Sequence, residues 1–180
     1  MNIITDIKYI EQYAKEHDKE NWKFRDFLKY RDFENLDDIV HNLYNEVSEK
    51  IDCTKCGNCC KTVRPVLDSE DISRFAFGLK IKINEFKSKY IIADKDIPDG
   101  EIFNKLPCPF LNDKLCSNYS HRPKNCELYP HLHNDDIVSR LWGIVDNYSV
   151  CPIVFNVYEQ LKLELWHADN EDSEDEDYYY

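Results

Sequence analysis

The chain has 180 residues, is 42% hydrophobic and 32% charged, and carries a formal net charge of −12 at pH 7. This length allows a single domain whose core needs no covalent cross-links, and the acidic excess excludes electrostatic capture of nucleic acid or an anionic membrane. No stretch is apolar enough to predict a membrane span, and the first 20 residues lack the pattern of a secretory signal. We therefore expect an intracellular protein, and specifically a cytoplasmic one.

Apolar residues recur at helical spacing in two N-terminal segments, residues 3–14 and 36–51. Between them, Asn21 is expected to cap a short aromatic helix. Together these segments predict an N-terminal helical segment, residues 1–50, that packs on the core. Its aromatic and aliphatic stripe is interpreted as core packing.

The middle and the end of the chain alternate helical patterns with turn signals. Asp68 or Ser69 is expected to cap a helix that ends at Gly78. Residues 83–91 predict a further helix that packs Ile83, Phe86 and Tyr90. The remaining expectations are turns and short strands over 97–118, a strand over 137–145 and a closing helix after Pro152.

The last 13 residues, 168–180, read "ADNEDSEDEDYYY" and hold seven acidic side chains without Lys or Arg. Such a segment is too charged and too poor in aliphatic residues to fold alone, so we expect a disordered acidic tail. Its charge would suit a basic protein partner.

The main chemical signal is a group of four cysteines in eight positions, "CTKCGNCC" at 53–60. Disulfides are typical of short secreted chains, whereas the same pattern in an intracellular chain indicates metal binding or catalysis. Every cysteine of the chain is a candidate metal ligand: Cys53, Cys56, Cys59, Cys60, Cys108, Cys116, Cys126 and Cys151.

The spacing within the first motif suits metal ligation. Two thiolates three positions apart can turn back onto one ion, and Gly57 gives the loop a permissive backbone. A third cysteine at the same interval, Cys59, favours an iron–sulfur cluster over zinc. The adjacent side chains of Cys59 and Cys60 are expected to diverge, so one of them would serve a second ion or be a buried thiol.

Two histidines and one arginine near these cysteines are further candidates for the site. His131 and His133 would share one face of a strand, although a solvated loop is the favoured interpretation. Arg122 is a candidate for offsetting thiolate charge through hydrogen bonds to sulfur.

Three segments resemble the YkgJ-like family of zinc- or iron-chelating proteins, also called UPF0153: "CTKCGNCC", "CPFLNDKLCSNYSHRPKNCELYP" and the "CP" at 151. The resemblance implies a CxxCxxCC metal-chelating domain at 51–155. The residue pattern after Pro152 predicts that the closing helix occupies 156–167. A larger relative, the flagellin lysine N-methylase, joins such cysteines to methyl transfer from S-adenosylmethionine. This chain looks too short to carry that enzyme.

The sequence therefore predicts an α-rich α+β protein, with a small irregular cysteine-cluster domain and an N-terminal helical layer. Its expected function is chelation of a metal ion, with zinc or an iron–sulfur cluster as cofactor and with Cys53, Cys56 and Cys59 as core ligands. The alternatives are a protein N-methyltransferase-like enzyme, an iron–sulfur redox enzyme, and a purely structural zinc site.

Overall fold

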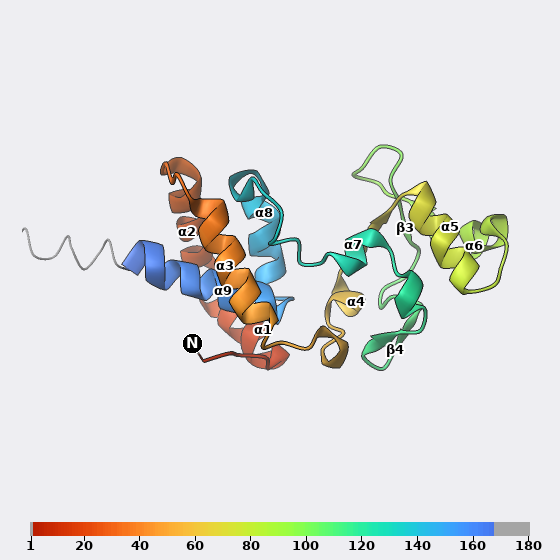
Figure 1. Cartoon of the computed structure of the whole chain (residues 1–180), viewed down its shortest axis with the longest axis horizontal. Coiled ribbons are helices and arrows are strands. Elements are labelled where there is room, and N and C mark those ends of the chain that lie inside the picture. The colour runs from red at the N-terminus through yellow and green to blue at the C-terminus, as the bar shows by residue number, and fades with distance from the viewer. Residues whose placement is uncertain (1, 168–180) are drawn as a thin grey trace, which may run out of the picture. The chain divides into compact units, whose positions relative to one another are not determined.

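The computed structural model describes residues 2–167, which form two compact units. A helical unit combines residues 2–51 with residues 130–167, and a cysteine unit comprises residues 52–129. Helices predominate over short strands (Figure 1), which confirms the predicted α-rich α+β class. The domain predicted at 51–155 thus includes the whole cysteine unit and the beginning of the second helical segment.

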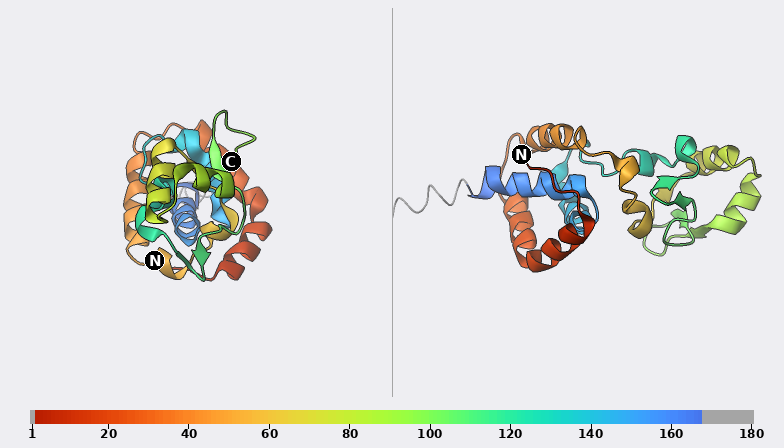
Figure 2. Two further views of the ribbon diagram at one scale, coloured as in Figure 1. Left: turned by 90° about the vertical axis from the view of Figure 1, so that its right-hand side faces the viewer. Right: turned by 90° about the horizontal axis from the view of Figure 1, so that it is seen from below.

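The helical unit is arranged around its last α-helix, α9 (Pro152–Leu161), which contacts α1, α3 and α8 (Figure 2). Pro152 occupies the first turn, where its missing N–H costs no helical hydrogen bond, and this confirms the predicted closing helix. The other elements are α1 (Ile7–Glu16), α2 (Asp18–Tyr30), α3 (Leu36–Ser48), α8 (Ile137–Tyr148) and the π-helical η3 (Lys162–His167).

A buried lysine joins α2 to the end of α9. Lys162 is 1% exposed, and its Nζ lies 2.8 Å from Glu20 Oε1 and 2.7 Å from Glu159 Oε1. The Tyr148 hydroxyl donates to the same Glu159 oxygen at 2.6 Å. An unpaired buried charge would cost several kcal/mol, so the two carboxylates allow this lysine to lie inside the unit.

Two sequence predictions for this unit are wrong. The segment 137–145, predicted as a strand, belongs to α8, because its buried residues follow helical rather than alternating spacing: Ile137, Leu141, Ile144, Val145 and Tyr148. Asn21 does not cap a helix: α2 begins at Asp18, and Asn21 lies within it, 2% exposed.

Short elements make up the cysteine unit. An antiparallel three-stranded sheet has the order β1 (Val66–Leu67), β3 (Glu101–Phe103), β2 (Ile91–Ala93). A separate hairpin pairs β4 (Leu111–Asn112) with β5 (Leu115–Cys116). The strands β3, β4 and β5 confirm the short strands predicted within 97–118. The helical elements are η1 (Cys53–Lys55), α4 (Cys59–Thr62), α5 (Ser69–Gly78), α6 (Ile83–Tyr90), η2 (Tyr119–His121) and α7 (Lys124–Glu127).

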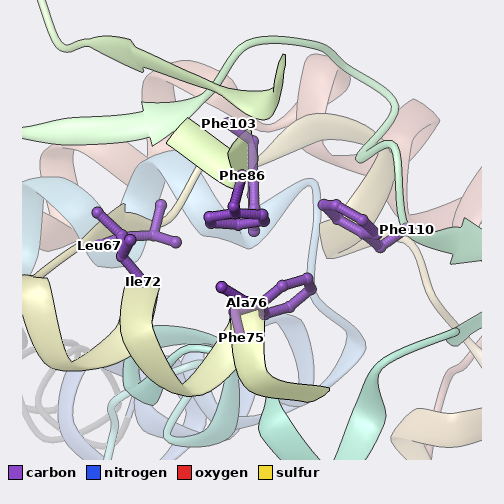
Figure 3. Close-up of a cluster of buried hydrophobic side chains, with 7 residues drawn as sticks. All are labelled: Leu67, Ile72, Phe75, Ala76, Phe86, Phe103 and Phe110. Carbon is purple, nitrogen blue, oxygen red and sulfur yellow. The ribbon is translucent and has the colours of Figure 1, made fainter. Parts of the chain in front are cut away.

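The core of the cysteine unit is a cluster of aromatic rings over α5 (Figure 3). The Phe75 ring lies 4.6 Å from Phe110, 5.4 Å from Phe86 and 5.5 Å from Phe103, measured between centroids. This core therefore connects α5 with α6, the three-stranded sheet and the segment before β4. Ile83, predicted to pack inward, is 46% exposed at the first position of α6.

Gly57 allows the first cysteine loop to lie against the β4–β5 hairpin. Its φ is +64°, and a Cβ atom there would lie 2.6 Å from the carbonyl oxygen of Lys114 in the hairpin turn. The position therefore requires glycine both for its left-handed backbone and for this close approach.

A carboxylate on α3 caps α8 within the helical unit. Asp37 accepts hydrogen bonds from the backbone N–H of Asp136 at 2.7 Å and of Ile137 at 2.9 Å. Partial burial opposes ionisation, but these bonds, with His41 and Arg140 nearby, outweigh it and lower the pKa of Asp37.

Within residues 2–167, no helix combines the length and apolarity needed to cross a bilayer. The predicted acidic tail at 168–180 lies outside the described residues.

Replacing Asp37 with Ala should destabilise the helical unit by about 0.5–2 kcal/mol, the usual effect of losing such a cap. A carboxyl with a lowered folded pKa stabilises above its unfolded pKa of about 4, so the difference from wild type should shrink as the pH falls through the folded pKa. Urea unfolding can be followed by tryptophan fluorescence, because Trp22, Trp142 and Trp166 all lie in this unit. Asp38→Ala, which removes an exposed charge beside the cap, is the matched control; equal effects of both substitutions would contradict the capping role.

Replacing Gly57 with Ala should open the contact between the first cysteine loop and the hairpin, at a cost of at least about 1–2 kcal/mol for the left-handed backbone alone. Faster amide hydrogen exchange is expected over residues 52–62 and 111–117. Gly143→Ala is the control: a Cβ there meets no atom within 4 Å, and alanine inside α8 should stabilise the helical unit. Unchanged exchange in the Gly57 variant would show that the loop does not depend on this approach.

Candidate metal centre

The first two cysteines lie in one tight turn. Cys53 begins η1, and the backbone N–H of Cys56 donates to the Cys53 carbonyl at 3.1 Å. The Asp52 carboxylate caps this turn by accepting from the Thr54 backbone N–H at 3.0 Å. Two thiols three positions apart are thus held on one loop, as the spacing predicts.

Cys60 lies beside two cysteines that are distant in sequence. Its carbonyl accepts a hydrogen bond from the backbone N–H of Cys108 at 2.7 Å. The Cys108 carbonyl in turn accepts from Leu111 at 3.0 Å, and Leu111 pairs with Cys116 across the β4–β5 hairpin. Backbone hydrogen bonds therefore connect α4, the segment before β4 and strand β5.

Cys126 is positioned through a polar network on α5. Asp71, 4% exposed, accepts from the Lys124 backbone N–H at 2.8 Å and from Arg74 at 2.8 Å. Arg74 also donates to the Arg122 carbonyl at 2.9 Å. These contacts fix the start of α7, the helix that carries Cys126. Sequence reasoning missed Asp71 and Arg74, although their i, i+3 spacing on a predicted helix was a usable signal.

Several of the thiols affect one another's pKa values. A hydrogen bond with the Cys59 thiol lowers the pKa of Cys60 to about 7. Burial, with the charges of Cys60 and Cys116, raises the pKa of Cys108 to about 11. Burial also raises the pKa of Cys126, and its neighbours Cys60, Cys108 and Cys116 raise it further. Four thiols from separate elements thus interact with one another, and Cys60 is common to them.

Cys53 and Cys56 form a second group. Partial desolvation raises the pKa of Cys53 although the residue lies at the surface, and the nearby Cys56 thiol and Asp52 carboxylate add to this effect. Cys53 is exposed, whereas Cys56 and Cys59 are half-buried. Cys59 contacts Cys60 and follows Cys56 by three positions in the motif.

Arg122 lies next to this sulfur-rich region. Its guanidinium stacks on the Tyr119 ring at 4.0 Å from the centroid, and its charge favours the thiolate form of Cys116, although burial dominates and raises the pKa of that thiol. The predicted role of Arg122 in offsetting thiolate charge is therefore compatible with its position.

The remaining candidate ligands, Cys151, His131 and His133, lie in the helical unit. Cys151 is buried at the N-cap of α9, 6% exposed. His131 and His133 lie before α8 with ring centroids 6.5 Å apart, and Tyr44 contacts His133. Neither histidine lies on a strand, because this segment is a turn.

Among residues 2–167, no group of three or more Cys, His, Asp or Glu side chains is arranged so that it could hold a metal ion. The chemistry of the donor set nevertheless fits zinc or iron, because both metals bind thiolates and the cysteine unit carries seven thiols.

No solved structure matches this chain significantly. A family model, CxxCxxCC, described as "Putative zinc- or iron-chelating domain", matches residues 52–152. This range runs from the cap of the first cysteine turn to the proline that begins α9, so it includes every cysteine of the chain. The match covers more than half of the sequence, and the chain belongs to the CxxCxxCC family of zinc- or iron-chelating domains.

Proposed function

We propose that the cysteine unit binds zinc or iron through the thiolates of Cys60, Cys108, Cys116 and Cys126. The observation that carries this proposal is the grouping of four thiols from α4, β5, α7 and the segment before β4, with Cys60 at its centre. Four thiolates complete the coordination shell of a tetrahedral ion.

The electrostatics of the group support a bound cation. Burial and mutual repulsion keep most of these thiols protonated when no cation is present. A divalent ion reverses this preference, because each thiol loses its proton and donates an electron pair to the metal. The positive charge of the metal ion thus offsets the negative charge of the thiolates.

The same grouping of thiols bears on which metal is bound. The sequence-based preference for an iron–sulfur cluster rests on Cys53, Cys56 and Cys59, three thiols that could each reach a different iron from one loop. The structure instead associates Cys60 with the distal thiols. This grouping supports individual zinc or iron ions, and assay of acid-labile sulfide distinguishes them from a cluster.

The direct test is the metal content of anaerobically purified protein. We expect bound zinc or iron, and at least a tenfold loss of affinity when Cys60, Cys108, Cys116 or Cys126 is replaced singly by Ser, because each substitution removes one ligand. Ser117→Ala changes an exposed side chain beside Cys116 and should retain wild-type metal content. Undiminished affinity in all four cysteine variants would refute the proposed ligand set.

Removal of the metal should loosen the cysteine unit. Structural metal sites contribute on the order of 10 kcal/mol, since the unfolded chain has no preformed site. Amide exchange over residues 52–129 should therefore accelerate in chelator-treated protein, while the unfolding transition reported by tryptophan fluorescence persists in the helical unit. Identical exchange with and without metal would mean that the metal is not part of the fold.

A further inference from the structure

We propose that Cys60 bridges two metal ions, so that the seven cysteines of the cysteine unit hold a binuclear thiolate centre. This inference rests on the proposed function and extends it from one ion to two. The inner ion would take the four thiolates described above, and the outer ion would share Cys60 with Cys53, Cys56 and Cys59.

The number of thiols leads to this arrangement. Two tetrahedral ions require eight ligand positions, and the cysteine unit supplies seven thiols. One thiolate that binds both ions supplies the eighth position. A mononuclear site would instead leave three thiols of the motif without a role, and one of them, Cys53, is exposed to solvent.

Cys60 is connected both to Cys59 of the first motif and to the distal cysteines. Its thiol hydrogen bonds with Cys59 on one side. On the other side its carbonyl binds the N–H of Cys108 at 2.7 Å, and its charge interacts with Cys116 and Cys126. A bridging thiolate must lie close to the ligands of both ions, because it directs one lone pair to each ion.

The contact between adjacent cysteines is compatible with a shared ion. The sequence suggested that the side chains of Cys59 and Cys60 diverge, but their thiols hydrogen bond in the structure. Two sulfurs bound to one tetrahedral zinc are separated by about 3.8 Å, given Zn–S bonds of about 2.3 Å. Hydrogen-bonded thiols have a similar sulfur–sulfur separation, so this contact is compatible with both thiolates binding the outer ion.

Charge also favours a bridge. A bridged centre contains seven thiolates, whereas two separate four-thiolate sites would contain eight. The bridged centre therefore places one negative charge fewer in the same volume. Arg122, beside Cys116, offsets part of the remainder. The turn at Gly57 places the outer loop against the hairpin that carries Cys116, so both ions would lie within one unit.

The test is titration of reduced, metal-free full-length protein with ¹¹³Cd²⁺, a thiophilic ion that reports thiolate ligation by NMR. We expect two bound equivalents and two thiolate-range resonances that split each other, because coupling passes through a bridging sulfur. Ser117→Ala should give the same spectrum. Cys53→Ser should leave one strongly bound equivalent with a single unsplit resonance, and Cys60→Ser should abolish the splitting.

Several outcomes would overturn the bridge: one equivalent in the wild type, two resonances without splitting, or splitting that survives Cys60→Ser. These differ from failure of the proposed function, which would appear as no bound cadmium, zinc or iron, or as full metal retention in the Cys108, Cys116 and Cys126 variants.

Discussion

Within the cysteine unit, the position of Cys126 depends on the carboxylate of Asp71, which joins α5 to the start of α7. One nearly buried oxygen accepts from the Lys124 backbone and from Arg74, and Arg74 reaches the Arg122 carbonyl. Hydrogen bonds to an ionised group are worth about 1.5–3 kcal/mol, roughly twice a neutral one. The strands of this unit are only two or three residues long, so they form few backbone hydrogen bonds with one another. The side-chain hydrogen bonds of Asp71 and Arg74 supply connections that a larger sheet would make through its backbone.

Close packing reinforces these connections at the other end of α5. The side-chain amide of Asn118 donates to the Phe75 carbonyl at 2.9 Å, while a Cβ at Gly78 would overlap Asn118 and His121. Phe75 itself anchors the aromatic core. The same helix thus packs against the hydrophobic cluster on one side and holds the segment between Cys116 and Cys126 on the other.

Sequence reasoning succeeded where local pattern determines structure. The apolar spacing of α3, the Asp68 cap of α5 and the cysteine intervals were all recognised because each depends on nearby residues. It failed over 137–145, which was predicted as a strand but packs as a helix. The central position of Cys60 was also missed, since it arises from contacts with cysteines 48 to 66 positions away, and no local pattern encodes which distant thiols meet.

The cysteine unit interrupts the helical unit between α3 and α8. Whenever that insert is unfolded, the helical unit must hold together the ends of a long flexible loop, which costs on the order of 4 kcal/mol by the logarithmic dependence on loop length. A folded insert fixes its own ends and removes part of that entropy. Folding of the insert and packing of the helical unit are therefore linked thermodynamically through the connectivity of the chain.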